Sequence, residues 1–184
     1  MPSRRYALVA YVKGPIAEFV EHLRKELHPD LPHLPAHITI LPPRPLQGTE
    51  ADAQATLDDL CKQVDPFDIT LGDVDTFIPS TPTVFVRVSR GAYKLRELHD
   101  RLNLGPLAYK EEFPYMPHLT IVKTTVPDQA DHAYATARER WTQFKGPHKV
   151  EVRELTFVRE QAQYQWVDLA GIKLGKTLAS ARSH

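Results

Sequence analysis

The 184-residue sequence contains one cysteine, Cys61, and carries no net charge. A single cysteine excludes an intrachain disulfide and any zinc site built from several cysteines. Basic and acidic residues number 23 each, whereas proteins that bind long nucleic acids through their phosphates usually carry a basic surplus. The charge balance therefore argues against non-specific binding to nucleic acid duplexes. It is compatible with a small phosphate substrate or the end of an RNA strand.

Long apolar runs are also absent. No run approaches the roughly 20 residues that a membrane-spanning helix needs, and residues 1–5 contain no apolar signal core. Apolar residues make up 42% of the chain and charged residues 25%, which is typical of globular proteins. We expect a cytoplasmic protein with no membrane association and no obligate protein partner. The length predicts a single domain over residues 1–184, with a frayed tail at 176–184.

Apolar residues recur with a helical period in four segments and follow strand-like patterns in seven others. The helices are expected over residues 15–27, 49–64, 91–103 and 127–141. The strands are expected over residues 6–12, 37–41, 67–78, 83–88, 118–122, 149–158 and 164–169. Pro42 and Pro43 are expected to end the second strand. The loops expected to set substrate selectivity are 29–35, 79–82, 105–117 and 159–163.

Two short segments share one pattern, in which a proline precedes a histidine, an aliphatic residue, a threonine and an isoleucine. The first contains His37 and Thr39, and the second contains His118 and Thr120. Because side chains alternate between the faces of a strand, each histidine shares a face with its threonine. Residues two apart on a strand lie roughly 7 Å apart. The histidine and threonine of one segment can therefore approach the same phosphate together.

The two segments occupy matching places in a repeated order of elements. His37 and His118 lie 81 positions apart (118 − 37), and the strands that start near Thr83 and Tyr164 have the same separation. Each half reads as strand, helix, His-x-Thr strand, helix, strand, strand. This regularity predicts a duplicated α+β unit whose halves face each other across a pseudo-twofold axis.

Two imidazoles and two hydroxyls on facing strands are suited to cleaving a phosphodiester without a metal ion. A neutral imidazole can take a proton from the attacking hydroxyl or water, and a protonated one can give a proton to the departing oxygen. Histidine suits both roles because its ordinary pKa of about 6.5 keeps both forms populated near neutrality. The threonine hydroxyls can donate hydrogen bonds to the non-bridging oxygens. We expect His37 and His118 to be catalytic, with no cofactor.

A metal site is the main chemical alternative. His28, His33 and His37 are close in sequence, but their spacings of five and four cross a proline-rich loop. No cysteine or carboxylate pattern accompanies them, and the known zinc spacings do not match. The sequence therefore favours a site without a metal ion.

The paired motifs, 81 residues apart in a chain of 184, resemble those of the two-histidine (2H) phosphoesterase superfamily. This superfamily includes bacterial 2′-5′ RNA ligases and RNA 2′,3′-cyclic phosphodiesterases. The resemblance implies a bilobal α+β fold, in which two antiparallel sheets with outer helices surround a central cleft. It also implies catalytic or phosphate-binding roles for His37, Thr39, His118 and Thr120. The expected partners are RNA ends or small cyclic-phosphate nucleotides.

Four further residues are candidates for substrate binding. Tyr115 can stack on a base or ribose, or can instead anchor its loop. Arg44 follows the first motif and Lys123 the second, so either can balance phosphate charge. Many relatives resemble the second motif but continue with arginine, and lysine cannot make the bidentate fork of arginine. Strand alternation also turns Lys123 away from the histidine unless the strand twists or ends there. Arg87 alternates with buried valines and can reach the cleft.

The leading hypothesis is a metal-independent phosphodiesterase that opens 2′,3′-cyclic phosphates to 2′-phosphates. RNA 2′-5′ ligation, in which a 5′-hydroxyl attacks the cyclic phosphate, is the near-reverse reaction and uses the same residues. A non-catalytic RNA- or nucleotide-binding module is an alternative of another class. The presence of both histidines and both threonines argues against it, because a decayed site is expected to lose at least one of them.

Overall fold

The computed structural model describes residues 3–28, 34–124 and 126–175. Its elements follow one another as β1 (Tyr6–Tyr11), α1 (Pro15–Leu27), β2 (His37–Arg44), α2 (Glu50–Cys61), β3 (Phe67–Thr76), β4 (Thr83–Arg90), α3 (Ala92–Leu102), the 3-10 turn η1 (Gly105–Leu107), β5 (His118–Lys123), α4 (Pro127–Gln143), β6 (Lys149–Val152), β7 (Glu154–Ala162) and β8 (Gln165–Lys173). The tail expected at 176–184 and most of the loop expected at 29–35 lie outside the described residues.

The elements expected from the sequence are present, with two differences. β2 runs through Pro42 and Pro43 to Arg44. A proline cannot donate a backbone hydrogen bond, but this end of β2 pairs with β1 only, so one edge of the strand needs no donor there. The single strand expected over 149–158 is instead two strands, because β6 pairs with β3 while β7 pairs with β1 in the other half of the sheet.

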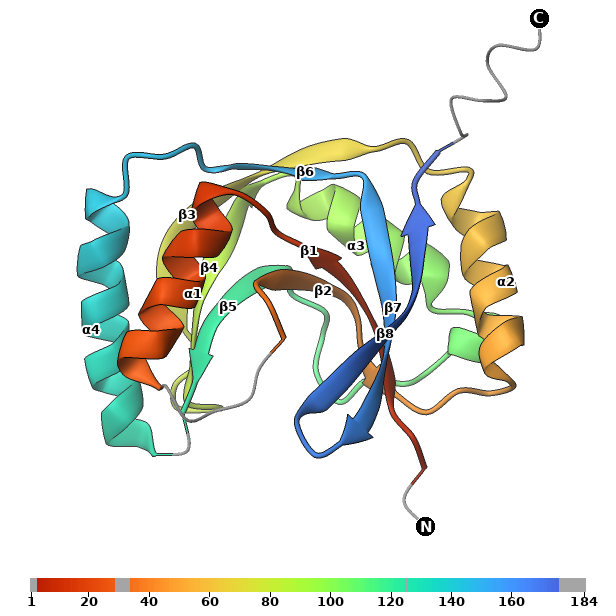
Figure 1. The fold of residues 1–184 in the computed structure, drawn as a ribbon, viewed down its shortest axis with the longest axis horizontal. Helices are drawn as coiled ribbons and strands as arrows, with labels where there is room; N and C mark the ends of the chain where they lie inside the picture. The colour runs from red at the N-terminus through yellow and green to blue at the C-terminus, as the bar shows by residue number, and fades with distance from the viewer. Residues whose placement is uncertain (1–2, 29–33, 125, 176–184) are drawn as a thin grey trace, which may run out of the picture.

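The strands form one curved antiparallel sheet in the order β6-β3-β4-β5-β2-β1-β7-β8 (Figure 1). Each half of this sheet has four strands, in agreement with the expected α+β fold of two antiparallel sheets. The halves meet at β5 and β2, which pair through Ile38 and Leu119. The two expected sheets are therefore joined edge to edge, with the two His-x-Thr strands at the junction.

The strand order confirms a duplication and corrects the way in which its halves correspond. Reversing the order exchanges β2 with β5, β1 with β4 and β3 with β7. The strand that starts at Thr83 is therefore the counterpart of β1, and not of the strand that follows Tyr164. Buried strands share one apolar composition, so an equal spacing between two of them does not establish that they are equivalent.

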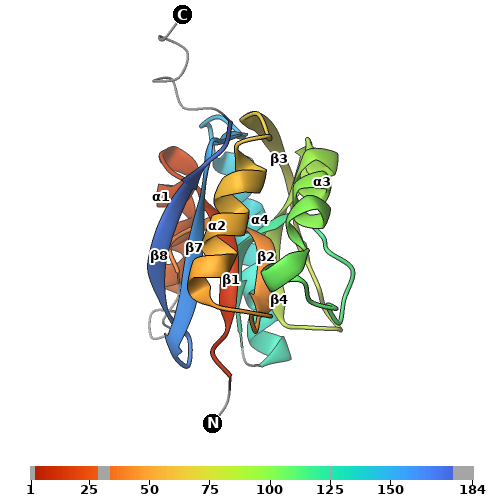
Figure 2. The same cartoon turned by 90° about the vertical axis from the view of Figure 1, so that its right-hand side faces the viewer.

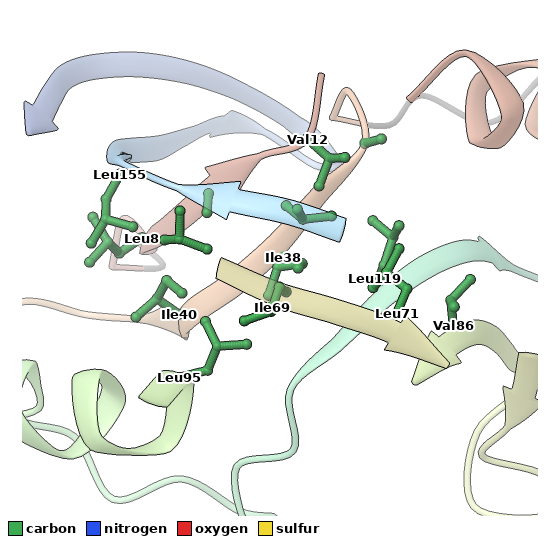
Figure 3. Packing of buried hydrophobic residues seen from close by; sticks show 14 of the residues in the cluster. Leu8, Val12, Ile38, Ile40, Ile69, Leu71, Val86, Leu95, Leu119 and Leu155 are labelled. Atoms are coloured by element: carbon green, nitrogen blue, oxygen red, sulfur yellow. The ribbon is translucent and has the colours of Figure 1, made fainter. Parts of the chain in front are cut away.

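The hydrophobic core lies between the sheet and the helices. Buried apolar residues from all four helices belong to one cluster with alternate residues of the strands, such as Leu8, Ile38 and Leu119 (Figure 3). α1 and α4 pack on the half with β3, β4 and β5, and α2 and α3 pack on the other half (Figures 1 and 2). Each large aliphatic side chain buried in this way contributes about 1.5–3 kcal/mol. The opposite face of the sheet, called the open face below, points away from the helices.

Local signals explain where the helices begin. Pro15 occupies the first turn of α1, where its missing N–H is not needed. Thr49 and Asp52 form a reciprocal capping box at the start of α2. Gly91 precedes α3 with a φ of 82°, and a Cβ there would lie 2.9 Å from the Asp68 carbonyl oxygen. In the described part of the chain, no helix is long and apolar enough to cross a membrane.

Candidate active site

The two His-x-Thr strands carry the same irregularity in their pairing. In β2 a β-bulge leaves Ile40 without a cross-strand partner, and in β5 a bulge leaves Ile121 without one. Both isoleucines are fully buried. A bulge adds a residue to one strand, bends it and re-aims the side chains that follow. The duplication therefore extends to the backbone directly after each threonine.

The pairing between β2 and β5 brings the two motifs together on the open face. His37, Thr39, His118 and Thr120 are half-buried and alternate with buried aliphatic residues. Ile38 pairs with Leu119 in antiparallel register. Continuing this register by one residue in each direction sets His37 level with Thr120, and Thr39 level with His118. Each histidine thus lies across from the threonine of the other motif.

The same backbone contact orients both imidazoles. Nδ1 of His37 lies 2.8 Å from the Pro35 carbonyl oxygen, and Nδ1 of His118 lies 2.7 Å from the Met116 carbonyl oxygen. A carbonyl oxygen can only accept, so Nδ1 carries the hydrogen in both rings. This leaves Nε2 of each ring as the nitrogen available for proton exchange. Neutral Nε2 accepts a proton, and protonated Nε2 donates one.

Burial lowers the pKa of both histidines. The pKa of His37 falls to about 4, mainly through desolvation and also through the positive charges of Arg24 and of protonated His118, against the opposing hydrogen bond to Pro35. Desolvation also lowers the pKa of His118. Both rings are therefore neutral at pH 7. An anionic phosphate between them favours the imidazolium form and raises the pKa again.

Tyr11 is the cross-strand partner of His37. The two rings meet edge to face, with their centroids 6.5 Å apart. The Tyr11 hydroxyl donates a 2.6 Å hydrogen bond to Asp168 on β8. Burial and this bond raise the pKa of Tyr11, so it remains a phenol whose oxygen can still accept a hydrogen bond. Tyr11 and Asp168 were not predicted from the sequence, because they come from separate strands and form no local motif.

His118 has a different environment. Phe77 and Phe85 contact it edge to face, with ring centroids 5.1 and 5.2 Å away, and the two phenylalanines stack on each other at 4.1 Å. Arg87 is the cross-strand partner of His118. Its guanidinium is exposed and donates one 3.2 Å hydrogen bond to Asp75. The apolar rings account for the desolvation of His118, and Arg87 places a positive charge on the same face.

Lys123 also lies on the open face. In regular alternation it would point away from His118, but the bulge at Ile121 shifts the phase by one residue. Its cross-strand partner is Thr83, two residues from Phe85, the partner of Thr120. Directly opposed residues of an antiparallel pair share a face. The sequence-predicted cations Arg87 and Lys123 are therefore both exposed on the half of the open face that carries His118.

The structure contradicts the prediction that Arg44 binds substrate. Its side chain is fully buried, and its guanidinium donates to the carbonyl oxygens of Pro42 and Leu107 and to the side chains of Asn103 and Glu111. The donors are thus occupied by protein groups. Arg44 ties the end of β2 to the loop that precedes β5. A sequence does not show that such a cation is buried, because all of its acceptors except Pro42 lie 59 to 67 positions away.

The structure also argues against substrate stacking by Tyr115. Its ring stacks on His99, with centroids 4.2 Å apart and planes 2° from parallel. Its hydroxyl donates a 2.8 Å hydrogen bond to the Thr39 carbonyl oxygen. Tyr115 is better described by the alternative role, a loop anchor. Tyr115 holds the backbone of the first motif from the core side.

Arg24 makes a comparable contact with the second motif and was not identified from the sequence. It is buried, and it donates to the carbonyl oxygens of Thr120 at 2.8 Å and Ile121 at 2.7 Å. Its only local signal is its position within the apolar stripe of α1, next to Leu23.

Within the described residues, no group of three or more histidine, cysteine or acidic side chains is arranged to hold a metal ion. His33, one of the three histidines considered for such a site, lies outside the described residues.

The chain is similar to known proteins in sequence and in fold. A candidate phosphoesterase of Halalkalibacterium halodurans is 25% identical over 172 residues, which cover 93% of this chain and 98% of the relative. The structure of E. coli LigT in complex with 3′-AMP matches with a TM-score of 0.59 at 18% identity, over 94% of this chain and 99% of LigT. The structure of TT0787 from Thermus thermophilus matches with a TM-score of 0.62 at 15% identity, over 94% and 100% of the two chains.

These two structural matches show the shared fold. Residues 12–163, which include both His-x-Thr motifs, match the 2′-5′ RNA ligase superfamily. The match covers most of the chain and confirms the resemblance drawn from the paired motifs. The chain belongs to the 2′-5′ RNA ligase superfamily of two-histidine phosphoesterases.

Proposed function

We propose that this protein opens 2′,3′-cyclic phosphates of RNA ends or nucleotides to 2′-phosphates, with His37 and His118 as an acid–base pair and without a metal ion. The observation that carries the proposal is the matched pair of imidazoles. Each has Nδ1 fixed by a carbonyl oxygen and Nε2 left for chemistry. A hydrolysis that needs one base and one acid requires two such groups.

The environments of the two histidines favour His37 as the base and His118 as the acid. Arg24 places a positive charge near His37, which disfavours the imidazolium form there. His37 is therefore the base: its Nε2 takes a proton from water as the water oxygen bonds to phosphorus. The bond from phosphorus to the 3′ oxygen breaks, and protonated His118 gives its Nε2 proton to that oxygen. The product carries a 2′-phosphate and a free 3′-hydroxyl.

The remaining open-face residues stabilise the phosphate in this proposal. The hydroxyls of Thr39 and Thr120 donate to the non-bridging oxygens, where negative charge increases in the transition state. Arg87 and Lys123 supply positive charge on the His118 side. The phosphate that these cations help to hold is itself an anion, and its charge offsets the desolvation that lowers the pKa of His118. The bound substrate thus helps His118 to hold the proton it must donate.

Ligation is the second candidate, and the superfamily match supports it. A 5′-hydroxyl of RNA replaces water as the nucleophile, and the bond to the 3′ oxygen breaks as before. The result is a 2′-5′ linkage, and the same two histidines move the protons. LigT, which shares the fold, has been crystallised with 3′-AMP and with NADP+. Nucleotide binding by LigT makes a nucleotide or RNA end a reasonable substrate for this chain.

The test is turnover of nucleoside 2′,3′-cyclic phosphates in EDTA, with products identified by chromatography. We expect 2′-phosphates from the wild type, and rates at least about 100-fold lower for His37→Ala and His118→Ala. His132→Ala, on the exposed side of α4, is the matched control and should behave as wild type. Equal rates for the wild type and both site variants, or no turnover of any cyclic phosphate, would disprove the proposal. RNA half-molecules in the same assay reveal ligation.

A further inference from the structure

The two histidines sit on strands that hold each other weakly. β2 and β5 share the single residue pair Ile38–Leu119, whereas other strand pairs of the sheet, such as β7 and β8, are paired over most of their length. A displacement of about 1 Å between catalytic groups can cost a large factor in rate. Side chains elsewhere must therefore fix the spacing between the two motifs.

One set of contacts comes from α1. Arg24 donates to the carbonyl oxygens of Thr120 and Ile121 in the second motif strand, and at 2.8 Å to that of Leu34, just before the first motif. Glu21 pairs with Arg24 at 3.2 Å and accepts a 2.9 Å hydrogen bond from the Ala36 backbone N–H. This α1 clamp joins the segment before His37 to the strand that carries His118.

A second set comes from α3 and the loop after it. Tyr115, just before the second motif, donates to the Thr39 carbonyl oxygen in the first motif strand. His99 on α3 stacks on the Tyr115 ring, and its Nε2 lies 2.6 Å from Glu111. Glu111 also accepts from Arg44 at the end of β2. This α3 clamp joins the segment before His118 to the strand that carries His37.

The two clamps are reciprocal. Each runs from the segment that precedes one motif to the strand of the other, and each ends on the carbonyl oxygen of a motif threonine, Thr39 or Thr120. They come from α1 and α3, which follow the equivalent strands β1 and β4. The duplication has thus kept the arrangement while different side chains, an arginine and a tyrosine, provide the donor.

We propose that Arg24 and Tyr115 are positioning residues that set the separation and orientation of His37 and His118. The expected effect on the reaction rate rests on the proposed function. The expected effect on the positions of the two histidines rests on the hydrogen bonds alone. Neither side chain contacts the substrate in this account. Each acts through the backbone of a threonine that donates to the phosphate.

Tyr115→Phe is the cleaner variant because it removes one hydroxyl and keeps the stacked ring. We expect kcat on a cyclic phosphate to fall about tenfold, with KM within twofold of wild type. Tyr134→Phe, which removes a hydroxyl from a half-buried tyrosine on α4, is the control and should leave both constants unchanged. A kcat for Tyr115→Phe within twofold of wild type, or an equal loss in the control, overturns the proposal.

Arg24 is tested with two variants, since Arg24→Met can fail to fold. Arg24→Lys keeps the charge but cannot reach the three carbonyl oxygens with a rigid fork. We expect a lower kcat with little change in KM, and a His37 pKa that stays low in Arg24→Lys. Arg24→Met, where folded, should raise the His37 pKa, because the nearby positive charge is gone. Wild-type kcat in Arg24→Lys overturns the role of the clamp.

Ring NMR spectra of His37 and His118 separate this inference from the proposed function. Because each clamp joins both motifs, Tyr115→Phe should shift the ring signals of both histidines, and Tyr134→Phe should shift neither. If the wild type turns over no cyclic phosphate, the proposed function fails, and the spectra still decide about the clamps. Signals that move only in the histidine nearest the substitution would overturn the inference.

Discussion

At the scale of single residues, the site depends on which nitrogen of each imidazole is engaged. Both Nδ1 atoms donate to carbonyl oxygens two residues upstream. The proline before each motif belongs to the same short segment, so the sequence pattern already contains the part of the chain that fixes the ring. The low pKa of His37 is also set by the immediate surroundings of a single residue, because it follows from burial and from one nearby arginine.

The threonines give the first prediction. Thr39→Val and Thr120→Val keep the shape of the side chain and remove the donor to the phosphate. We expect kcat/KM on a cyclic phosphate to fall about 10- to 100-fold in each, the usual effect of losing a hydrogen bond to a charged group. Steady-state kinetics measure this, and circular dichroism checks the fold. Full activity in both variants would show that the hydroxyls do not contact the reacting phosphate.

The pKa of His37 predicts how stability depends on pH. Its folded value of about 4 lies below the ordinary value of 6.5, so the unfolded chain binds more protons between these values. The free energy of unfolding should therefore have its full value above about pH 6.5 and should decrease as the pH falls from 6.5 toward 4. Urea denaturation at pH 7 and pH 5 measures the decrease. It should be smaller in His37→Gln, and an equal decrease in both proteins would contradict the low pKa.

At the scale of elements, the sequence predicted the two His-x-Thr strands and the face that each histidine shares with its threonine. It did not predict the bulges at Ile40 and Ile121, because an extra residue in a strand changes pairing without changing composition. The placement of Lys123 depends on that bulge. The prediction for Arg44 is wrong for a related reason: its acceptors Asn103 and Glu111 are distant in sequence.

Substitutions of Arg44 and Arg87 are expected to have opposite effects, the first on stability and the second on substrate binding. Arg44→Met removes the buried guanidinium and leaves the partly buried carboxylate of Glu111 without one of its partners, and should lower the free energy of unfolding by about 3–5 kcal/mol. Arg87→Met removes an exposed cation from the open face. It should raise KM for a cyclic phosphate several-fold and change stability by less than about 1 kcal/mol. Denaturation and kinetics on both variants test this, and the reverse pattern would restore Arg44 as the phosphate-binding residue.

At the scale of the whole molecule, duplication explains most of what could be predicted. Two similar units supply one histidine and one threonine each, and the sheet brings them together where β2 meets β5. The equivalence of β1 with β4 could not be predicted from the spacing of strands along the sequence, because it depends on the order of the strands in the sheet. The differences between the halves, with Tyr11 beside His37 and Arg87 beside His118, give a symmetric scaffold two unequal imidazoles.

The different roles proposed for the two histidines are tested most directly with a substrate whose leaving group needs no proton. In a 2′,3′-cyclic phosphate with sulfur at the bridging 3′ position, the departing thiolate is stable without an acid. Single-turnover rates on this substrate should recover in His118→Ala to near the wild-type rate and remain low in His37→Ala. Recovery of His37→Ala instead would reverse the roles of the two histidines. Equal rates for both variants on both substrates would contradict the acid–base pair itself.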